Sequence, residues 1–297
     1  MPNTLAHLGI QGLTTRALLP DADDKWIYLG CILPDLPWIL QRLVRFASNG
    51  VDPYDLRLYC TVQASLLFCL LLSLALAMIS KQFWKTFAIV GLNSLLHLLL
   101  DACQTKWGNG VHLVAPFNWQ LTNFDLFWPE SFLTHVLTAF GLVYLIASWR
   151  RSIRTPPELT LQPVIRLFAF VALLTAYFSL PFLLLMGPER ADSHFVKTLR
   201  NSRDRPGRYV EIDRGEYSER NSLRLISTFA GENLSVDNVI FNRSATVSVQ
   251  GTFVSRNQIH VKEYHLHSPL IRDGSTYLGL TVVAMLWLSA FLRGKIR

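Results

Sequence analysis

Long apolar segments constrain the fold of this chain more than any other feature of its sequence. Four segments carry almost no charge, and each is about twenty residues long, enough to cross the hydrocarbon core of a bilayer: 61–80, 131–149, 167–187 and 274–292. A fifth, 86–105, is interrupted only by Asp101. The sequence therefore predicts an α-helical multi-pass membrane protein with about five transmembrane helices, whose first partner is the lipid bilayer.

The positions of the basic residues predict which way these helices run. Lys and Arg gather beside the apolar segments, at 81–85, 150–154 and 293–297. Because such clusters stay on the cytoplasmic side, we expect the residues before 61 and residues 188–273 outside, and the C-terminus inside. The net charge of +7 then reflects membrane topology. No basic stripe is present, so nucleic acid is not an expected partner.

A change of composition at residue 188 divides the chain. We expect a helical membrane domain at 1–187, a β-rich extracytoplasmic domain at 188–273, and a final transmembrane helix with a basic cytoplasmic tail at 274–297. Within the second part, three stretches alternate between polar and apolar residues as half-buried strands do: 222–229, 245–254 and 258–267. A small antiparallel sheet or barrel is predicted, with an OB-like fold as the candidate.

The segment 26–46 is harder to place. It is apolar enough to enter the bilayer, but Pro34 and Pro37 flank Asp35 and are expected to break a regular helix. We expect a short helix that lies at the membrane interface or dips into it. A true crossing would move the N-terminus to the other side.

Four polar residues form the main candidate site. His97 and Asp101 stand four residues apart, so they share one helical face, and both lie where hydrocarbon penalises a polar group without a partner. The predicted topology adds His7 and Asp35 on the same outer side. Two imidazoles and two carboxylates are a suitable ligand set for zinc, or for manganese as the alternative.

Each of these residues also has a structural interpretation. His7 can be a surface or capping histidine, and Asp35 can be the N-cap of the helix that follows it. His97 and Asp101 together can be a hydrogen-bonded pair that holds two helices together. The sequence alone leaves both interpretations open.

Weaker candidates for further ligands or acid/base groups are spread along the chain. His112 follows a Gly-Asn-Gly turn, and Glu130 and His135 stand five residues apart, which is not quite one helical face. Asp52 and Asp55 can support ligands or cap a helix that begins at Pro53.

A second metal site is conceivable in the β-rich region. His265 and His267 share one face of a predicted strand, with His260 on the opposite phase. We favour a solvated strand face over a metal site here.

Three stretches together resemble a known family. They are MPNTLAHLGIQGL, LGCILPDLPW and LNSLLHLLLDACQTKWGNGVHLVAPF, which span about the first 120 residues. They resemble the membrane-bound metal-dependent hydrolase family, the YdjM-like inner-membrane proteins. More distantly, they are similar to zinc-dependent phospholipase C and P1-type nucleases. The resemblance implies a bacterial inner-membrane location and metal ligation by His7, Asp35, His97 and Asp101.

The chain departs from that family pattern at one place. Many members carry an HRGxTHS-like stretch before the first long apolar segment, where this chain reads YCTVQAS, with Tyr59 and Ala64 at the places expected for histidines. Three alternatives follow: a centre reduced to one metal, a centre rebuilt with Asp52 or Asp55, or an inactive site.

These observations favour a membrane-embedded metal-dependent hydrolase that acts at the outer leaflet on a phosphoester or a lipid headgroup, with zinc or manganese as cofactor. The alternative is a non-catalytic membrane scaffold whose β-rich region binds a lipid, wall or protein partner. A transporter is a third class, but no inverted repeat or pair of broken helices supports it. The sequence gives no indication of the oligomeric state.

Overall fold

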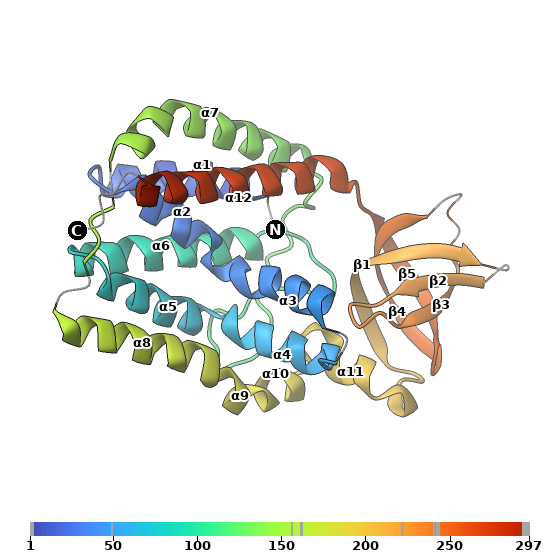
Figure 1. Cartoon of the computed structure of the whole chain (residues 1–297). Coiled ribbons are helices and arrows are strands. Elements are labelled where there is room, and N and C mark those ends of the chain that lie inside the picture. Colours follow the sequence, from blue (N-terminus) through green and yellow to red (C-terminus); the bar gives the residue numbers. More distant parts are fainter. Residues whose placement is uncertain are drawn as a thin grey trace.

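The computed structural model divides the chain into a helical body and a small β-barrel at one end of it (Figure 1). It describes residues 3–48, 50–155, 157–160, 163–220, 223–239, 241 and 244–292. The predicted basic tail at 293–297 lies outside the described residues. The predicted combination of a mostly helical chain with a separate β-rich domain is confirmed.

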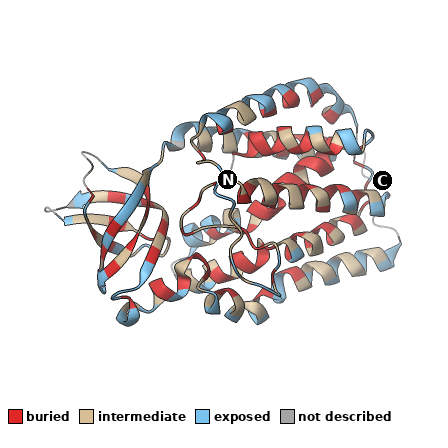
Figure 2. Cartoon of the chain, turned by 180° about the vertical axis from the view of Figure 1, so that it is seen from behind, coloured by how far each residue is buried: buried red, intermediate tan, exposed pale blue. Residues whose placement is uncertain are grey.

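The helices of the body run side by side, and the faces that they turn toward one another are buried (Figure 2). In chain order they are α1 (Thr4–Leu18), α2 (Asp24–Ile32), the 3-10 turn η1 (Leu33–Asp35), α3 (Leu36–Ala47), α4 (Pro53–Gln63), α5 (Leu66–Met78), α6 (Phe83–Ala102), α7 (Phe132–Arg154), α8 (Val164–Ser179), α9 (Pro181–Leu184), α10 (Met186–Arg190) and α12 (Pro269–Leu292). Short turns lead from α10 to the barrel: η2 (Ser193–Phe195), α11 (Val196–Arg200) and η3 (Ser202–Asp204).

In the described part of the chain, five helical stretches are long and apolar enough to cross a membrane, in agreement with the predicted number. They are Asp24–Ala47, Phe83–Ala102, Phe132–Arg154, Val164–Arg190 and Leu270–Leu292. The pair α4 and α5 adds a sixth if the two helices are counted as one broken span. The set therefore differs from the predicted one at two places.

The first difference is the segment 26–46. In place of a short interfacial helix, α2, η1 and α3 form a continuous path of 24 residues that qualifies as a span. Pro34 and Pro37 are the second residues of η1 and α3, within the first turn of each. A proline there lacks only an N–H that a helix start leaves unpaired. The prolines therefore redirect the chain without ending the helical path.

The second difference is the segment 61–80. It is divided between α4 and α5, which meet at an angle of 65°, so α5 keeps only 13 residues. The break lies at Ala64 and Ser65. The Ser65 hydroxyl donates to the Val62 carbonyl, and the Leu66 N–H donates to the His112 carbonyl. Hydropathy did not reveal this break because both residues at it are small and uncharged.

The helix α1 packs against four other helices of the body: α7, α2, α6 and α12. Its contact with α7 depends on glycine: a Cβ atom on Gly9 would lie 2.3 Å from the Cα atom of Gly141. Small residues of this kind let membrane helices approach closely. The close contact buries His7 completely.

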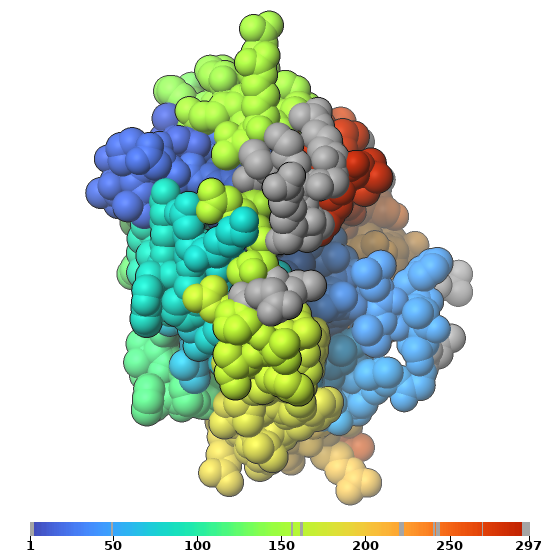
Figure 3. Space-filling model, turned by 60° about the vertical axis from the view of Figure 1, so that its left-hand side comes forward, coloured from blue at the N-terminus to red at the C-terminus, as the bar shows by residue number. Residues whose placement is uncertain are grey.

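A buried polar network, here called the Asp24 cluster, joins α1, α2 and α7. The end of the helical body that points away from the barrel comes forward in Figure 3. The Asp24 carboxylate accepts hydrogen bonds from the Arg16, Arg151, Ser152 and Tyr144 side chains. A buried charge with this many donors is well compensated.

The barrel has five strands: β1 (Tyr209–Arg220), β2 (Leu223–Ser227), β3 (Asn233–Asp237), β4 (Ala245–Ser255) and β5 (Gln258–Leu266). They close in the order β1-β2-β3-β5-β4, with β3 and β5 parallel and the other pairs antiparallel. The inward-facing side chains form its own hydrophobic core.

The barrel is attached to the loop between α6 and α7. The Gly108 N–H donates to the Glu211 carboxylate at 2.6 Å, and the Asn109 amide donates to Asp213 at 2.8 Å. Gly108 has φ +67°, and a Cβ atom there would lie 2.7 Å from the Glu211 carbonyl oxygen. This close approach therefore requires glycine, and it fixes the barrel over the end of α6.

Candidate metal centre

The four main candidates converge, although they come from three separate elements. His7 lies on α1, Asp35 on η1, and His97 and Asp101 on the last turns of α6. His97 and Asp101 share one helical face, as their spacing predicts.

Distances within this group, here called the His7–Asp101 centre, show how closely the side chains approach. The rings of His7 and His97 stack with centroids 4.0 Å apart. The His97 Nε2 atom lies 3.4 Å from Asp35 Oδ1 and 3.9 Å from Asp101 Oδ2. The His7 Nε2 atom lies 3.5 Å from Asp101 Oδ1. Both Nε2 atoms and both carboxylates therefore face one small region.

The opposite ring nitrogen of each histidine is held by a hydrogen bond. The His97 Nδ1–H donates to the Cys31 carbonyl, which leaves the Nε2 lone pair free. The His7 Nδ1 atom lies 2.9 Å from the Gln11 amide, whose Oε1 has no partner of its own. If the Gln11 amide is rotated by 180°, its Oε1 accepts a hydrogen bond from the Nδ1–H of His7. The Nε2 lone pair of His7 is then free, as it is in His97.

The unsatisfied atoms test whether a metal suits this centre. His7 Nε2, His97 Nε2 and Asp101 Oδ1 are buried and have no hydrogen-bond partner among the described residues, and the three residues are 0%, 1% and 7% exposed. Each such atom costs about 1–3 kcal/mol. One ligand atom from each residue lies within 4.8 Å of the others. A divalent cation satisfies all of them at once, so this donor set suits one.

Lys106 balances part of the negative charge of the centre. Its Nζ atom lies 2.9 Å from Asp101 Oδ2, the oxygen that faces away from His7. Asp101 is thus arranged to offer one oxygen to a metal and the other to Lys106.

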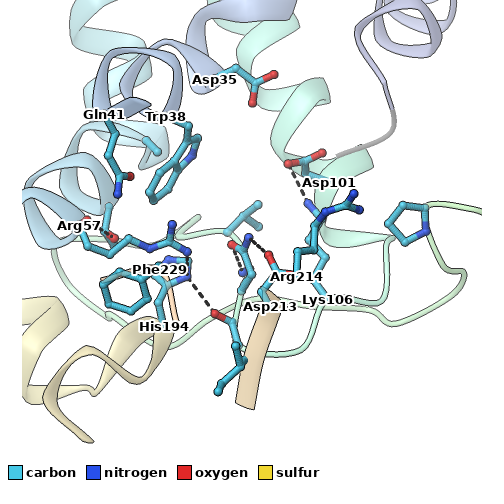
Figure 4. A pocket seen from close by; sticks show the side chains of 18 of the residues that line it. Asp35, Trp38, Gln41, Arg57, Asp101, Lys106, His194, Asp213, Arg214 and Phe229 are labelled. Atoms are coloured by element: carbon cyan, nitrogen blue, oxygen red, sulfur yellow. Dashed lines mark hydrogen bonds and ion pairs between the residues drawn. The ribbon is translucent and has the colours of Figure 1, made fainter. Parts of the chain in front are cut away.

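The centre opens into a pocket of about 470 Å³ between the helical body and the barrel (Figure 4). Asp35, His97 and Asp101 line it, whereas His7 lies behind them. The barrel contributes Asp213, Arg214 and further residues to its walls. Access to the centre therefore runs from the barrel side of the molecule.

The structure keeps the weaker acidic candidates away from this centre. Asp52 caps α4 by accepting from the N–H groups of Tyr54 and Asp55, as one alternative had it. Asp52 and Asp55 also pair with Arg200 at the surface, and the N-cap bonds hold the pKa of Asp52 below its usual value against burial, which raises it. A centre rebuilt with either residue finds no support in this geometry.

The remaining histidine candidates and the departure from the family pattern lie as follows. His112 lines the pocket, and burial lowers its pKa to about 4. His135 is exposed and bonds to the Ser131 carbonyl. Ala64 lines the pocket, whereas the Tyr59 hydroxyl donates to the Phe178 carbonyl at the body surface.

Glu130 meets two histidines of the barrel in a second cluster, here called the barrel latch. Glu130 Oε1 lies 2.8 Å from His267 Nδ1, and Oε2 lies 3.3 Å from His265 Nε2. Arg214 also bonds to Glu130, and Trp128 stacks on His265 with centroids 3.6 Å apart. The latch can in principle hold a metal ion, but Arg214 already compensates its carboxylate. The predicted solvated strand face is thus an interface.

Hydrogen bonds set the ionisation of the latch. Burial raises the pKa of Glu130, but the bonds to His265 and His267 and the charge of Arg214 outweigh it and hold that pKa well below its usual range. Burial lowers the pKa of His267. Both pKa shifts agree with a neutral His267 that is hydrogen-bonded to an ionised Glu130.

Ser248 completes a row with His267 and Glu130 that has the order of a serine hydrolase triad. Ser248 Oγ lies 2.8 Å from His267 Nε2. The hydroxyl is nevertheless fully buried, and it already bonds to the Arg214 N–H and to Asp213. It has no room to attack a substrate, so we assign the row a structural role.

Sequence reasoning missed the cationic residues of the pocket, namely Arg42, Arg45, Arg57, Lys106, Arg214 and Arg272. Of these residues, only Lys106 lies close in sequence to a predicted ligand, since it follows Asp101 in the loop that leaves α6.

No family model matches the sequence, no curated protein matches it, and no solved structure matches its fold.

Proposed function

We propose that this protein is a membrane-embedded, metal-dependent hydrolase whose metal is held by His7, His97 and Asp101, with Asp35 beside them. The observation that carries the proposal is the set of buried, unsatisfied nitrogen and oxygen atoms that two separate helices, α1 and α6, direct at one point. Zinc suits two imidazoles and a carboxylate with an open position, and manganese is the alternative.

The residues around the centre have distinct roles in this proposal. A divalent cation supplies positive charge that makes water a better nucleophile at neutral pH and polarises a phosphoryl oxygen. Asp35 lines the pocket and lies outside the closest three-residue group. It acts as a fourth ligand or as the general base that accepts a proton from water. Lys106 stabilises negative charge that develops on the substrate.

The substrate that we propose is a phosphoester or a lipid headgroup at the outer face of a bacterial inner membrane. The arginines of the pocket support an anionic substrate. The α5–α6 connection with Lys81 and Lys85, and the basic end of α7, lie at the end away from the barrel, which supports an extracytoplasmic barrel. The resemblance of the first 120 residues to YdjM-like proteins agrees with this assignment.

We propose that the barrel is OB-like and covers the pocket as a lid. Five strands in a closed sheet support the OB-like assignment. Its residues Glu211, Asp213, Arg214 and Thr246 form one wall of the pocket, which supports a role in holding substrate over the centre.

Hydrolysis of bis(p-nitrophenyl) phosphate by the purified protein in mild detergent tests the proposed function. We expect turnover that a chelator abolishes and added zinc or manganese restores. Asp35→Asn lowers the rate about hundredfold or more if Asp35 is the general base, and His97→Ala abolishes it. Turnover that neither chelation nor His97→Ala changes would overturn the proposal, and His135→Ala serves as the matched histidine control.

A further inference from the structure

The pocket wall opposite the metal centre carries an unusual arginine. Arg57 on α4 lies across the pocket from Asp101 and Lys106 (Figure 4). Its guanidinium stacks over the Trp38 ring at 4.7 Å and over the Phe229 ring at 5.1 Å. The stacking holds the planar group in place at the pocket wall, which suits it to bind an anion.

Arg57 lacks the carboxylate partner that other cations of the pocket have. Among the residues that the structure describes, no carboxylate forms an ion pair with it, and its Nε atom is buried without a hydrogen-bond partner. By contrast, Lys106 pairs with Asp101 and Arg214 pairs with Glu130. A half-buried guanidinium without a carboxylate in direct contact favours binding of an oxyanion, although the charge of Asp213 acts on it from a distance.

His194 lies beside Arg57 on a strained turn. The Arg57 Nη2 atom is 3.4 Å from His194 Nδ1, and His194 Nε2 is buried without a partner. Asp192, His194 and Phe195 have φ angles of +51°, +55° and +56°, a conformation that costs non-glycine residues free energy. The strained backbone of this turn places the His194 imidazole at the pocket wall, and such strain is typical of functional sites.

The helix α3 joins this wall to the membrane. Its inner face lines the pocket with Trp38, Gln41, Arg42 and Arg45, whereas its outer face exposes Leu40, Leu43 and Phe46, the last by 93%. α3 is the end of a stretch that can span a bilayer. A lipid lying along α3 therefore has acyl-chain contacts outside and cationic side chains inside.

We propose that Arg57, with His194, Arg42 and Arg45, forms a second anion-binding subsite that holds a phosphate group of a membrane lipid across the pocket from the metal centre. The subsite itself needs no metal; its role in choosing substrate rests on the proposed function. Together the two sites select a lipid whose headgroup carries a second anionic group besides the phosphoester at the centre.

Titration calorimetry on the full chain in mild detergent with a chelator present tests the subsite apart from the metal. The probes are inorganic phosphate, dihexanoyl phosphatidic acid, and dihexanoyl phosphatidylcholine as the headgroup control. We expect phosphatidic acid to bind more tightly than either of the others. Arg57→Met, which keeps an unbranched apolar side chain but removes the guanidinium, weakens its binding about tenfold to hundredfold, whereas Arg57→Lys weakens it less because the charge remains.

Matched variants make each result decisive. Arg150→Met changes an exposed arginine at the other end of the body and is expected to leave phosphatidic acid binding unchanged. Should the Arg57 variants fail to fold, Arg42→Met at the exposed rim gives the same test with a smaller loss of about threefold. Unchanged binding in the Arg57→Met protein overturns the subsite, and so does binding that requires metal. Equal affinity for phosphate and for phosphatidic acid overturns the lipid assignment.

Discussion

Two buried polar clusters in one helical body differ in how completely their atoms are satisfied. In the Asp24 cluster, four side chains donate to one carboxylate. In the His7–Asp101 centre, at the other end of α1, three buried ligand atoms have no hydrogen-bond partner within the described ranges. Both clusters join α1 to neighbouring helices, so the need to hold helices together explains the first cluster but not the orphaned atoms of the second.

The difference separates polar groups that serve the fold from those that serve a ligand. Buried polar groups are nearly always hydrogen-bonded, and exceptions concentrate at functional sites. The barrel latch belongs with the Asp24 cluster in this respect, since Glu130 and His267 are each held by several partners. The following predictions change one member of a cluster and ask whether stability or ligand binding responds.

The largest effect on stability is expected from the satisfied cluster. Asp24→Asn leaves Arg16 and Arg151 without their carboxylate and lowers the free energy of unfolding by about 2–4 kcal/mol. This is less than for a fully buried pair, because the Arg151 side chain is 46% exposed. Thermal unfolding in detergent measures it, with the exposed Asp204→Asn as control. If Asp24→Asn and Asp204→Asn are equally stable, the Asp24 cluster does not stabilise the fold as proposed.

Changing the residue that orients His7 is expected to affect metal binding more than stability. Gln11→Met removes the hydrogen bond to the His7 Nδ1 atom. Loss of such a partner typically lowers metal affinity about 10–100-fold. Competition with a fluorescent zinc chelator measures the affinity. An unchanged affinity would show that Gln11 does not orient the ligand.

The latch is expected to make stability depend on pH. Because the pKa of His267 is lowered in the folded state, the folded protein binds fewer protons than the unfolded chain below about pH 6.5. Stability is therefore full above that pH and falls on acidification. His267→Gln removes the contribution of this histidine to the pH dependence of the free energy of unfolding, which is at most about 1.4 kcal/mol per pH unit. Unfolding curves between pH 5 and 7 for both proteins test it, and parallel curves would refute it.

The smallest effect is expected when orphaned atoms are removed from the metal-free centre. The double substitution His7→Phe with Gln11→Met replaces both hydrogen-bond partners by apolar side chains of similar size. We expect the metal-free protein to be unchanged or stabilised by about 1 kcal/mol, although metal binding is lost. A marked destabilisation in thermal unfolding would indicate that the centre is mainly structural.

Local patterns made part of the fold and of the site predictable. The i,i+4 spacing of His97 and Asp101 places both on one face of α6 whatever surrounds it, and alternation located the long strands β4 and β5. His7 and Asp35 required the predicted topology and the family resemblance as well, since α1 and η1 reach α6 only through tertiary packing.

Other features depend on contacts that no local pattern reports. Arg57 meets His194, and Glu130 meets His267, each across 137 residues of sequence. The break between α4 and α5 depends on a bond from Leu66 to His112, which hydropathy does not record. Segment 26–46 is longer than predicted because Pro34 and Pro37 lie at helix starts, where proline does not interrupt the helical path.

The metal content of the purified protein tests the central claim most directly. We expect wild type and His135→Ala, purified in mild detergent with zinc and manganese supplied, to hold about one metal ion per chain by elemental analysis. His97→Ala and Asp101→Asn are expected to lose it while keeping the unfolding temperature of the metal-free protein. A wild-type protein that binds neither metal, or a His97→Ala protein that keeps its ion, would contradict the account.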